Sequence, residues 1–78
     1  MSLTPKQIRE LVVEYLRVLY PKSGDVEITY LVKDTTTDSW KVNVRFKRDM
    51  ADFFTFIAML AMDSQGDITQ FKEGWHWT

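Results

Sequence analysis

Few residue types in this sequence could do chemistry. The only histidine, His76, lies between Trp75 and Trp77, and the chain has no cysteine. A metal site in a protein takes several ligands from histidine, cysteine and carboxylate side chains, so one isolated imidazole predicts neither a metal site nor a resident cofactor. We interpret His76 as a structural or exposed side chain.

The segment from Asp63 to Asp67 brings several side-chain oxygens together, which would suit calcium. It lacks the alternating acids and the distal glutamate of an EF-hand loop. A single glycine, Gly66, among polar residues is typical of a hairpin turn in which glycine takes a positive φ. We therefore predict a solvated turn here.

No motif for covalent or acid–base catalysis is present. No serine has a base motif around it, and no glycine-rich loop would bind phosphate. Asp49 and Asp52 are paired acids, but they lie in a connector without the surroundings that tune catalytic carboxylates. We predict that the chain is not an enzyme.

Basic residues could form a stripe on one face of a hairpin. The stripe comprises Lys33, Lys41, Arg45 and Lys47. With aromatic rings nearby, it would resemble a sheet platform for single-stranded nucleic acid. Asn43 interrupts the stripe, neighbouring acids offset it, and the formal net charge is −1, so no overall field attracts nucleic acid. Nucleic-acid binding is therefore an alternative to the main expectation.

Length and composition limit the architecture. A chain of 78 residues forms one domain, residues 1–78, with a small core. Apolar residues make up 45% and charged residues 27%, which favours a folded protein in water. The absence of cysteine fits a cytoplasmic location. The longest apolar run is about ten residues, half of a membrane span, and no secretory signal is visible, so we expect no membrane association.

Residues 4–20 predict one amphipathic helix. It starts at Thr4-Pro5-Lys6-Gln7, where threonine caps, proline takes the first helical position and glutamine completes a capping box. Apolar residues then recur at helical spacing, at Ile8, Leu11, Val12, Tyr15, Leu16 and Leu19. Glu14 and Arg17 have the i,i+3 spacing of an attractive pair. The helix should end near Tyr20, before a proline.

Two alternating segments predict an antiparallel hairpin. Residues 25–33 would place Val26, Ile28, Tyr30 and Val32 on one face. Alternation is complete from Trp40 to Phe46, with Trp40, Val42, Val44 and Phe46 pointing inward. A polar connector, residues 34–38, joins the two strands.

The apolar run from Phe53 to Met62 has no clean period, so two readings compete. As a helix over residues 50–63, it would start from an aspartate cap. As a strand, its aromatic and β-branched start suits a pleated sheet. The hairpin-type turn that follows, and a further alternating strand from Ile68 to Trp77, favour the strand.

The predicted fold is therefore α+β, with an N-terminal helix packed on a four-stranded antiparallel meander (α-β-β-β-β). The alternative is α-β-β-α-β. A lone helix covers one face of a sheet, which leaves apolar residues on the other face. Those residues are Ile57, Met59, Trp75 and Trp77. An open apolar face indicates a partner, so we expect a non-catalytic interaction or assembly module that binds a second copy or another protein. A small-ligand carrier with a pocket between helix and sheet is a further alternative.

About half of the chain carries a recognisable set of features. They are a tryptophan opening an alternating strand (Trp40-Lys41-Val42-Asn43-Val44), an acidic connector, a strand ending in Leu60-Ala61-Met62-Asp63, a turn at Gly66, and aromatic residues at Phe71-Lys72 and Trp75. In these features the chain resembles the gas vesicle synthesis protein O family, although it has Trp75-His76-Trp77 in place of an arginine-rich aromatic terminus. Small peptidase-propeptide-like modules share the hairpin pattern. The resemblance implies a non-enzymatic accessory protein.

Overall fold

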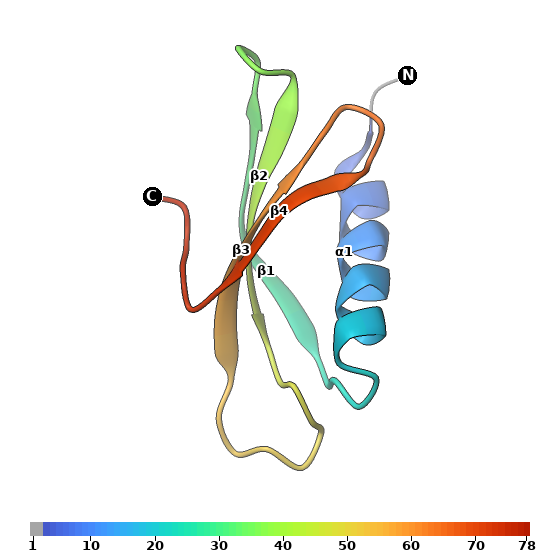
Figure 1. Cartoon of the computed structure of the whole chain (residues 1–78), viewed down its shortest axis with the longest axis vertical. Coiled ribbons are helices and arrows are strands. Elements are labelled where there is room, and N and C mark those ends of the chain that lie inside the picture. Colours follow the sequence, from blue (N-terminus) through green and yellow to red (C-terminus); the bar gives the residue numbers. More distant parts are fainter. Residues whose placement is uncertain (1–2) are drawn as a thin grey trace.

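The computed structural model describes residues 3–78 and consists of one helix packed against one sheet (Figure 1). The elements are α1 (Pro5–Leu19), β1 (Val26–Asp34), β2 (Ser39–Phe46), β3 (Phe56–Met62) and β4 (Ile68–Glu73). All strand pairs are antiparallel, and the strands lie in chain order, β1-β2-β3-β4. The α-β-β-β-β prediction is confirmed, and the alternative with a helix over residues 50–63 is wrong.

The start of α1 follows from its first four residues. The backbone N–H of Gln7 donates to Thr4 Oγ1 at 3.2 Å, and the Gln7 side chain accepts from the Thr4 backbone N–H at 2.8 Å. This reciprocal capping box satisfies donors that the first helical turn leaves free. The predicted start is confirmed. At the other end, the Tyr20 backbone N–H donates to Leu16 O at 2.7 Å, and Pro21 follows.

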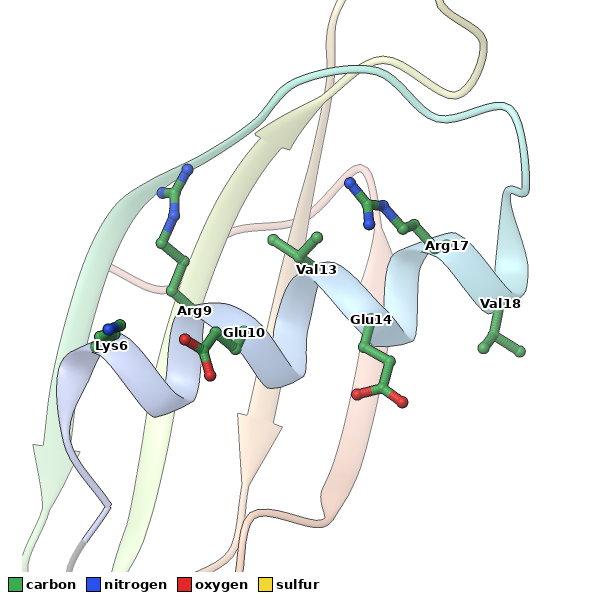
Figure 2. A pocket seen from close by; sticks show the side chains of 7 residues that line it. All are labelled: Lys6, Arg9, Glu10, Val13, Glu14, Arg17 and Val18. Carbon is green, nitrogen blue, oxygen red and sulfur yellow. The ribbon is translucent and has the colours of Figure 1, made fainter.

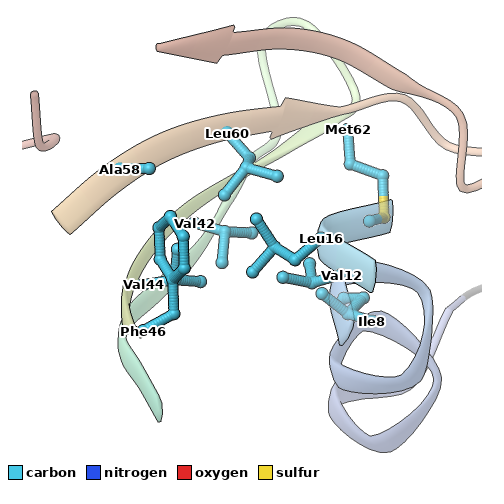
Figure 3. Packing of buried hydrophobic residues seen from close by; sticks show 9 residues of the cluster. All are labelled: Ile8, Val12, Leu16, Val42, Val44, Phe46, Ala58, Leu60 and Met62. Atoms are coloured by element: carbon cyan, nitrogen blue, oxygen red, sulfur yellow. The ribbon is translucent and has the colours of Figure 1, made fainter. Parts of the chain in front are cut away.

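The core lies between α1 and the sheet. Side chains from one stripe of α1 meet the inward residues of β2 and β3 (Figure 3). The buried set is Ile8, Val12, Leu16, Val42, Val44, Phe46, Ala58, Leu60 and Met62. Complete burial of a side chain as large as Leu16 contributes about 1.5–3 kcal/mol. Only one face of the sheet is used in this way, because α1 is the only helix among the described residues.

A β-bulge in β1 changes which residues face the core. Thr29 has no partner on β2, so the alternation shifts by one residue at that point. The register is Ile28 opposite Val44, Tyr30 opposite Asn43 and Leu31 opposite Val42. The prediction that Tyr30 and Val32 share a face with Val26 and Ile28 is therefore wrong. The unpaired Thr29 shifts the alternation by one residue, so that Leu31, and not Tyr30, faces the core.

The turn between β3 and β4 is the predicted polar hairpin turn. Asp63 Oδ1 accepts from the backbone N–H groups of Gln65 at 2.9 Å and Asp67 at 3.0 Å. Gly66 has φ 93°, a left-handed value that glycine adopts without a steric penalty. A Cβ atom at Gly66 would lie 2.9 Å from Leu11 Cδ1. The left-handed backbone therefore favours glycine here, and a larger residue would also require the end of the Leu11 side chain to shift.

The last strand is shorter than the alternation of its sequence suggests. β4 ends at Glu73, and Gly74 has φ 84°. From this glycine the chain turns back along the sheet on the side opposite α1 (Figure 1). The prediction of a strand as far as Trp77 is therefore wrong, because the left-handed glycine ends the pairing. None of the helices in the described part of the chain is long and apolar enough to cross a membrane.

Candidate functional site

The sheet face opposite α1, here called the outer face, is partly covered by the chain's own C-terminal tail, residues 74–78. Asn43 is 6% exposed and holds this tail through two hydrogen bonds. Its amide nitrogen donates to Trp77 O at 2.8 Å, and its amide oxygen accepts from the Trp77 backbone N–H at 2.7 Å. The Trp77 indole N–H donates to Leu60 O at 2.9 Å. Trp77 is thus fixed over the middle of the sheet.

This tail changes the predicted interaction surface. Met59, which pairs with Asn43 across the strands, is buried, and Trp77 is half-buried. Ile57 and Trp75 remain exposed, at 40% and 55%. Gly74 N–H donates to Ile57 O at 2.8 Å, which places Trp75 close to Ile57 in space. Of the four predicted residues, the structure therefore leaves two at one end of the outer face available for contact.

The basic residues of the predicted stripe do not form one continuous surface. Lys41 and Arg45 lie on the outer face, whereas Lys33 is opposite the inward residue Trp40 and Lys47 follows the end of β2. The ion pairs are Lys33–Asp38 at 3.6 Å, Lys41–Asp34 at 3.6 Å and Arg45–Glu27 at 3.7 Å. Lys41 Nζ also lies 4.9 Å from the centre of the Trp77 ring. These contacts offset the positive charge of three of the four residues, which weakens the stripe as a surface for a phosphate backbone.

Asp34, which pairs with Lys41, has a carboxyl group with a lowered pKa. The backbone N–H of Thr36 donates to Asp34 Oδ1 at 3.0 Å. This bond, together with the nearby Lys41 ammonium, lowers the pKa of the Asp34 carboxyl from its ordinary value. Asp34 is therefore a fixed negative charge at neutral pH, which further weakens the basic stripe.

A polar cluster joins the end of α1 to β4 and to the segment after β2. The Tyr20 hydroxyl donates to Glu73 Oε2 at 2.6 Å, and Arg48 Nη1 lies 3.2 Å from Glu73 Oε1. The Arg48 guanidinium carbon is 3.7 Å from the centre of the Phe56 ring. The hydrogen bond to Glu73 raises the pKa of the Tyr20 hydroxyl, because ionisation would remove the proton that makes the bond; the nearby Glu73 charge adds to the effect.

This cluster anchors the most exposed apolar segment of the chain. Residues 47–55, here called the Phe loop, connect β2 to β3 at the end of the sheet far from the β3–β4 turn (Figure 1). Phe53 is 96% exposed, Phe54 78% and Met50 74%. We predicted Phe53 and Phe54 as the start of a strand, and this is wrong, because β3 begins at Phe56.

The local cause is a turn at Asp49. Its carboxylate accepts from the Ala51 backbone N–H at 2.9 Å, and its backbone carbonyl accepts from the Asp52 N–H at 2.9 Å. Aspartate favours such turns because its short side chain bonds to nearby backbone. The two aspartates in Asp49-Met50-Ala51-Asp52 are the sequence signal for this turn. The strand propensity of the two phenylalanines outweighed this turn signal in the sequence-based prediction.

A cleft lies beside the Phe loop, between α1 and the start of β1. This surface, here called the Arg cleft, has a volume of about 290 Å³. It is lined by Arg9, Val13, Arg17, Ser23, Gly24, Asp25, Val26 and Met50. It opens onto a wider groove of about 670 Å³ along the solvent side of α1 (Figure 2). Two arginines against one aspartate leave the lining with a formal charge of +1.

The arginines of this cleft are not paired with acids. Within the described residues, neither Arg9 nor Arg17 has a carboxylate oxygen within 4.0 Å, and Arg9 makes one long bond of 3.3 Å to Val26 O. Figure 2 shows the side chains of Arg17 and Glu14 pointing away from each other, so the predicted attraction between them is not formed. The Ser23 hydroxyl in the cleft wall is buried and has no hydrogen-bond partner within residues 3–78. The cleft thus offers donors to an acidic group.

The groups that suggested metals lie apart. His76 is exposed in the tail, and the Asp63 carboxylate is occupied by backbone N–H groups of its own turn. Across residues 3–78, no three side chains from histidine, cysteine, aspartate and glutamate come together in a way that would hold a metal ion.

Comparison of the chain with protein-family models, with curated proteins and with solved structures finds no match. The resemblance to the gas vesicle synthesis protein O family therefore stays a prediction. The surfaces described above carry the functional argument on their own.

Proposed function

We propose that this chain is a non-catalytic protein-interaction module that makes its main contact through the Phe loop. The observation that carries the proposal is the exposure of Phe53 and Phe54, at 96% and 78%. Burying a phenylalanine side chain contributes about 1.5–3 kcal/mol. Two adjacent rings left in water therefore forgo a large stabilisation that a partner surface would supply.

The attachment of the loop supports this function. Gly24 N–H donates to Lys47 O at 3.0 Å, and Met50 N–H donates to Lys22 O at 3.0 Å. The Arg48–Glu73 ion pair holds the same segment from the β4 side. A loop whose first half is held in this way loses less conformational entropy when it binds than a free one. The two rings are thus presented on a supported base.

Two further exposed apolar residues, Ile57 and Trp75, extend the contact surface. Ile57 follows the Phe loop in β3, and Trp75 lies close to Ile57. Lys72 Nζ lies 3.8 Å from the centre of the Trp75 ring. Aromatic residues are enriched at the centre of protein interfaces. The two exposed residues of the predicted set therefore fit the same proposal.

The test is photo-crosslinking in cells that naturally express the chain. Phe54 is replaced by the photoreactive amino acid p-benzoyl-phenylalanine, and Thr36, in the turn at the other end of the hairpin, is replaced in a control. We expect covalent protein adducts from position 54 that position 36 does not form. If illumination gives only adducts shared by both positions, or adducts with nucleic acid alone, the proposed function is wrong.

A further inference from the structure

We infer that the Phe loop of one copy inserts into the Arg cleft of a second copy, and that the contact is reciprocal, so that two copies form a closed dimer. This inference rests on the proposed function and names its partner. The contact joins an acidic, aromatic loop tip to a basic cleft with apolar walls.

Charge complementarity carries the first step. The loop tip, residues 49–54, contains Asp49 and Asp52 and no basic residue. The Arg cleft contains Arg9 and Arg17, neither of which has a carboxylate partner in the described chain. Arginine binds carboxylates through paired N–H donors, and such bonds are stronger than neutral ones. Asp52, directly before the exposed rings, would take one of these guanidinium groups.

Apolar surface carries the second step. Val13, Val26 and Met50 line the Arg cleft, and Met50 is 74% exposed. These side chains would contact the rings of Phe53 and Phe54 from the other copy. The cleft therefore matches the loop in charge and in apolarity.

The Phe loop and the Arg cleft lie next to each other, which favours an assembly that ends at two chains. Met50 belongs to the Phe loop and also lines the Arg cleft, so protrusion and cleft form one continuous surface. A two-fold axis through such a surface places each protrusion in the other copy's cleft, which completes the assembly at two chains. A stable interface buries roughly 800 Å² on each partner. Two aromatic rings bury about 150–250 Å² each, so the cleft walls and Met50 must supply the rest.

Other ways of pairing two copies are obstructed. The bulge at Thr29 interrupts β1, which is one edge of the sheet, and such bulges oppose edge-to-edge pairing. The other edge, β4, is only 6 residues long. The centre of the outer face is covered by the tail through Trp77. The Phe loop and the Arg cleft are thus the best remaining complementary pair.

The experiment is sedimentation velocity of the full chain over a range of concentrations. The expected dimer mass is 18.4 kDa, twice the chain mass of 9.2 kDa. Phe53→Ser with Phe54→Ser, or Arg9→Glu with Arg17→Glu, should each raise the dimer Kd at least about 100-fold. Lys41→Glu with Arg45→Glu makes the same charge change on the outer face and should leave Kd within about threefold.

Mixing the two disrupted variants gives a sharper result. The arginine variant keeps an intact loop and the phenylalanine variant keeps an intact cleft, so one full contact can form between them. We expect the mixture to associate at least about tenfold more tightly than either variant alone. This comparison needs both variants folded, which circular dichroism checks; a misfolded arginine variant is replaced by Arg9→Ala with Arg17→Ala.

The outcomes separate the two proposals. A wild-type chain that stays at 9.2 kDa up to about 1 mM, and whose dimer Kd therefore lies above that concentration, overturns the dimer, while protein adducts from position 54 would keep the proposed function. A dimer insensitive to the arginine changes overturns the inference even if it requires the phenylalanines. A dimer insensitive to both pairs, without specific adducts at position 54, overturns both.

Discussion

Asn43 and Trp77 are 34 residues apart in the chain and exchange a pair of hydrogen bonds on the outer face. The side-chain amide of Asn43 gives the Trp77 backbone the hydrogen bonds that a neighbouring strand would otherwise provide. It satisfies the N–H and the C=O of one residue in the tail. Asn43 is the one buried polar residue among those described. A buried amide is costly unless it is hydrogen-bonded, and the tail supplies the partners that Asn43 needs.

Replacing Asn43 by leucine should therefore release the tail. The Trp77 backbone groups would lose both partners, and the fold should lose about 1–3 kcal/mol of unfolding free energy. Tryptophan fluorescence should shift to the red as Trp77 enters water. Urea unfolding and emission spectra measure the two effects. Gln70→Leu, at an exposed position on β4, is the matched control and should change neither; an unshifted spectrum in Asn43→Leu would contradict the role of the amide.

Alkaline titration should reveal the bond between Tyr20 and Glu73. The raised pKa of Tyr20 means that the hydrogen bond stabilises the fold below about pH 10 and that this contribution disappears as pH rises through the raised pKa. Glu73→Gln should return the Tyr20 pKa toward its ordinary value. Ultraviolet difference absorbance of tyrosinate, with Tyr20→Phe to assign the transition, measures it. Identical titration curves for wild type and Glu73→Gln would show that the carboxylate is not the cause.

Two glycines with similar backbone angles should respond differently to alanine. Gly66→Ala combines left-handed strain with a 2.9 Å contact to the end of the Leu11 side chain, which must shift to make room, and should cost about 1.5–3 kcal/mol. Gly74→Ala has the strain alone, since no heavy atom of the described residues lies within 4 Å of the added Cβ, and should cost about 1–2 kcal/mol. Chemical denaturation ranks them. The reverse order would mean that the turn does not pack on α1 as described.

The exposed phenylalanines should be dispensable for folding. Phe53→Ser with Phe54→Ser should change the unfolding free energy of the monomer by less than about 0.5 kcal/mol, because neither ring is buried. Phe46→Ala, at a position with 0% exposure, should cost about 3–5 kcal/mol. Urea unfolding at concentrations below any self-association provides the values. A large loss in the double variant would assign these rings a structural role and remove the basis of the proposed function.

The sequence predicted the fold where a local rule was sufficient. The capping box placed the start of α1, the alternation from Trp40 to Phe46 placed β2, and Gly66 marked the turn. Where two rules competed, the outcome was mixed: the strand reading of the run from Phe53 to Met62 was right from Phe56 onward, whereas its start at Phe53 and the phase of β1 were wrong. The phase of β1 depends on an unpaired Thr29, and a bulge leaves no clear mark in a segment where apolar side chains occur on both faces.

The candidate site was harder to predict than the fold. Phe53 and Phe54 have high strand propensity, so only the Asp49 turn distinguishes a loop from a strand at that point. The Arg cleft depends on how α1 packs relative to β1, and the spacing of residues in the sequence does not predict this packing. The fold-back of the tail follows from Gly74 together with a distant partner, Asn43, which is invisible without the sheet.

The chain-order pairing of the four strands has a kinetic meaning. Each hairpin closes over a short connection, so the sheet can zip from one turn to the next with little loss of chain entropy, a topology associated with rapid folding. α1 is the exception: the ribosome completes it before the strands, yet the side chains that bury Ile8 and Leu16 come from β2 and β3. During synthesis, the apolar stripe of α1 therefore stays exposed to water until β2 and β3 have left the ribosome.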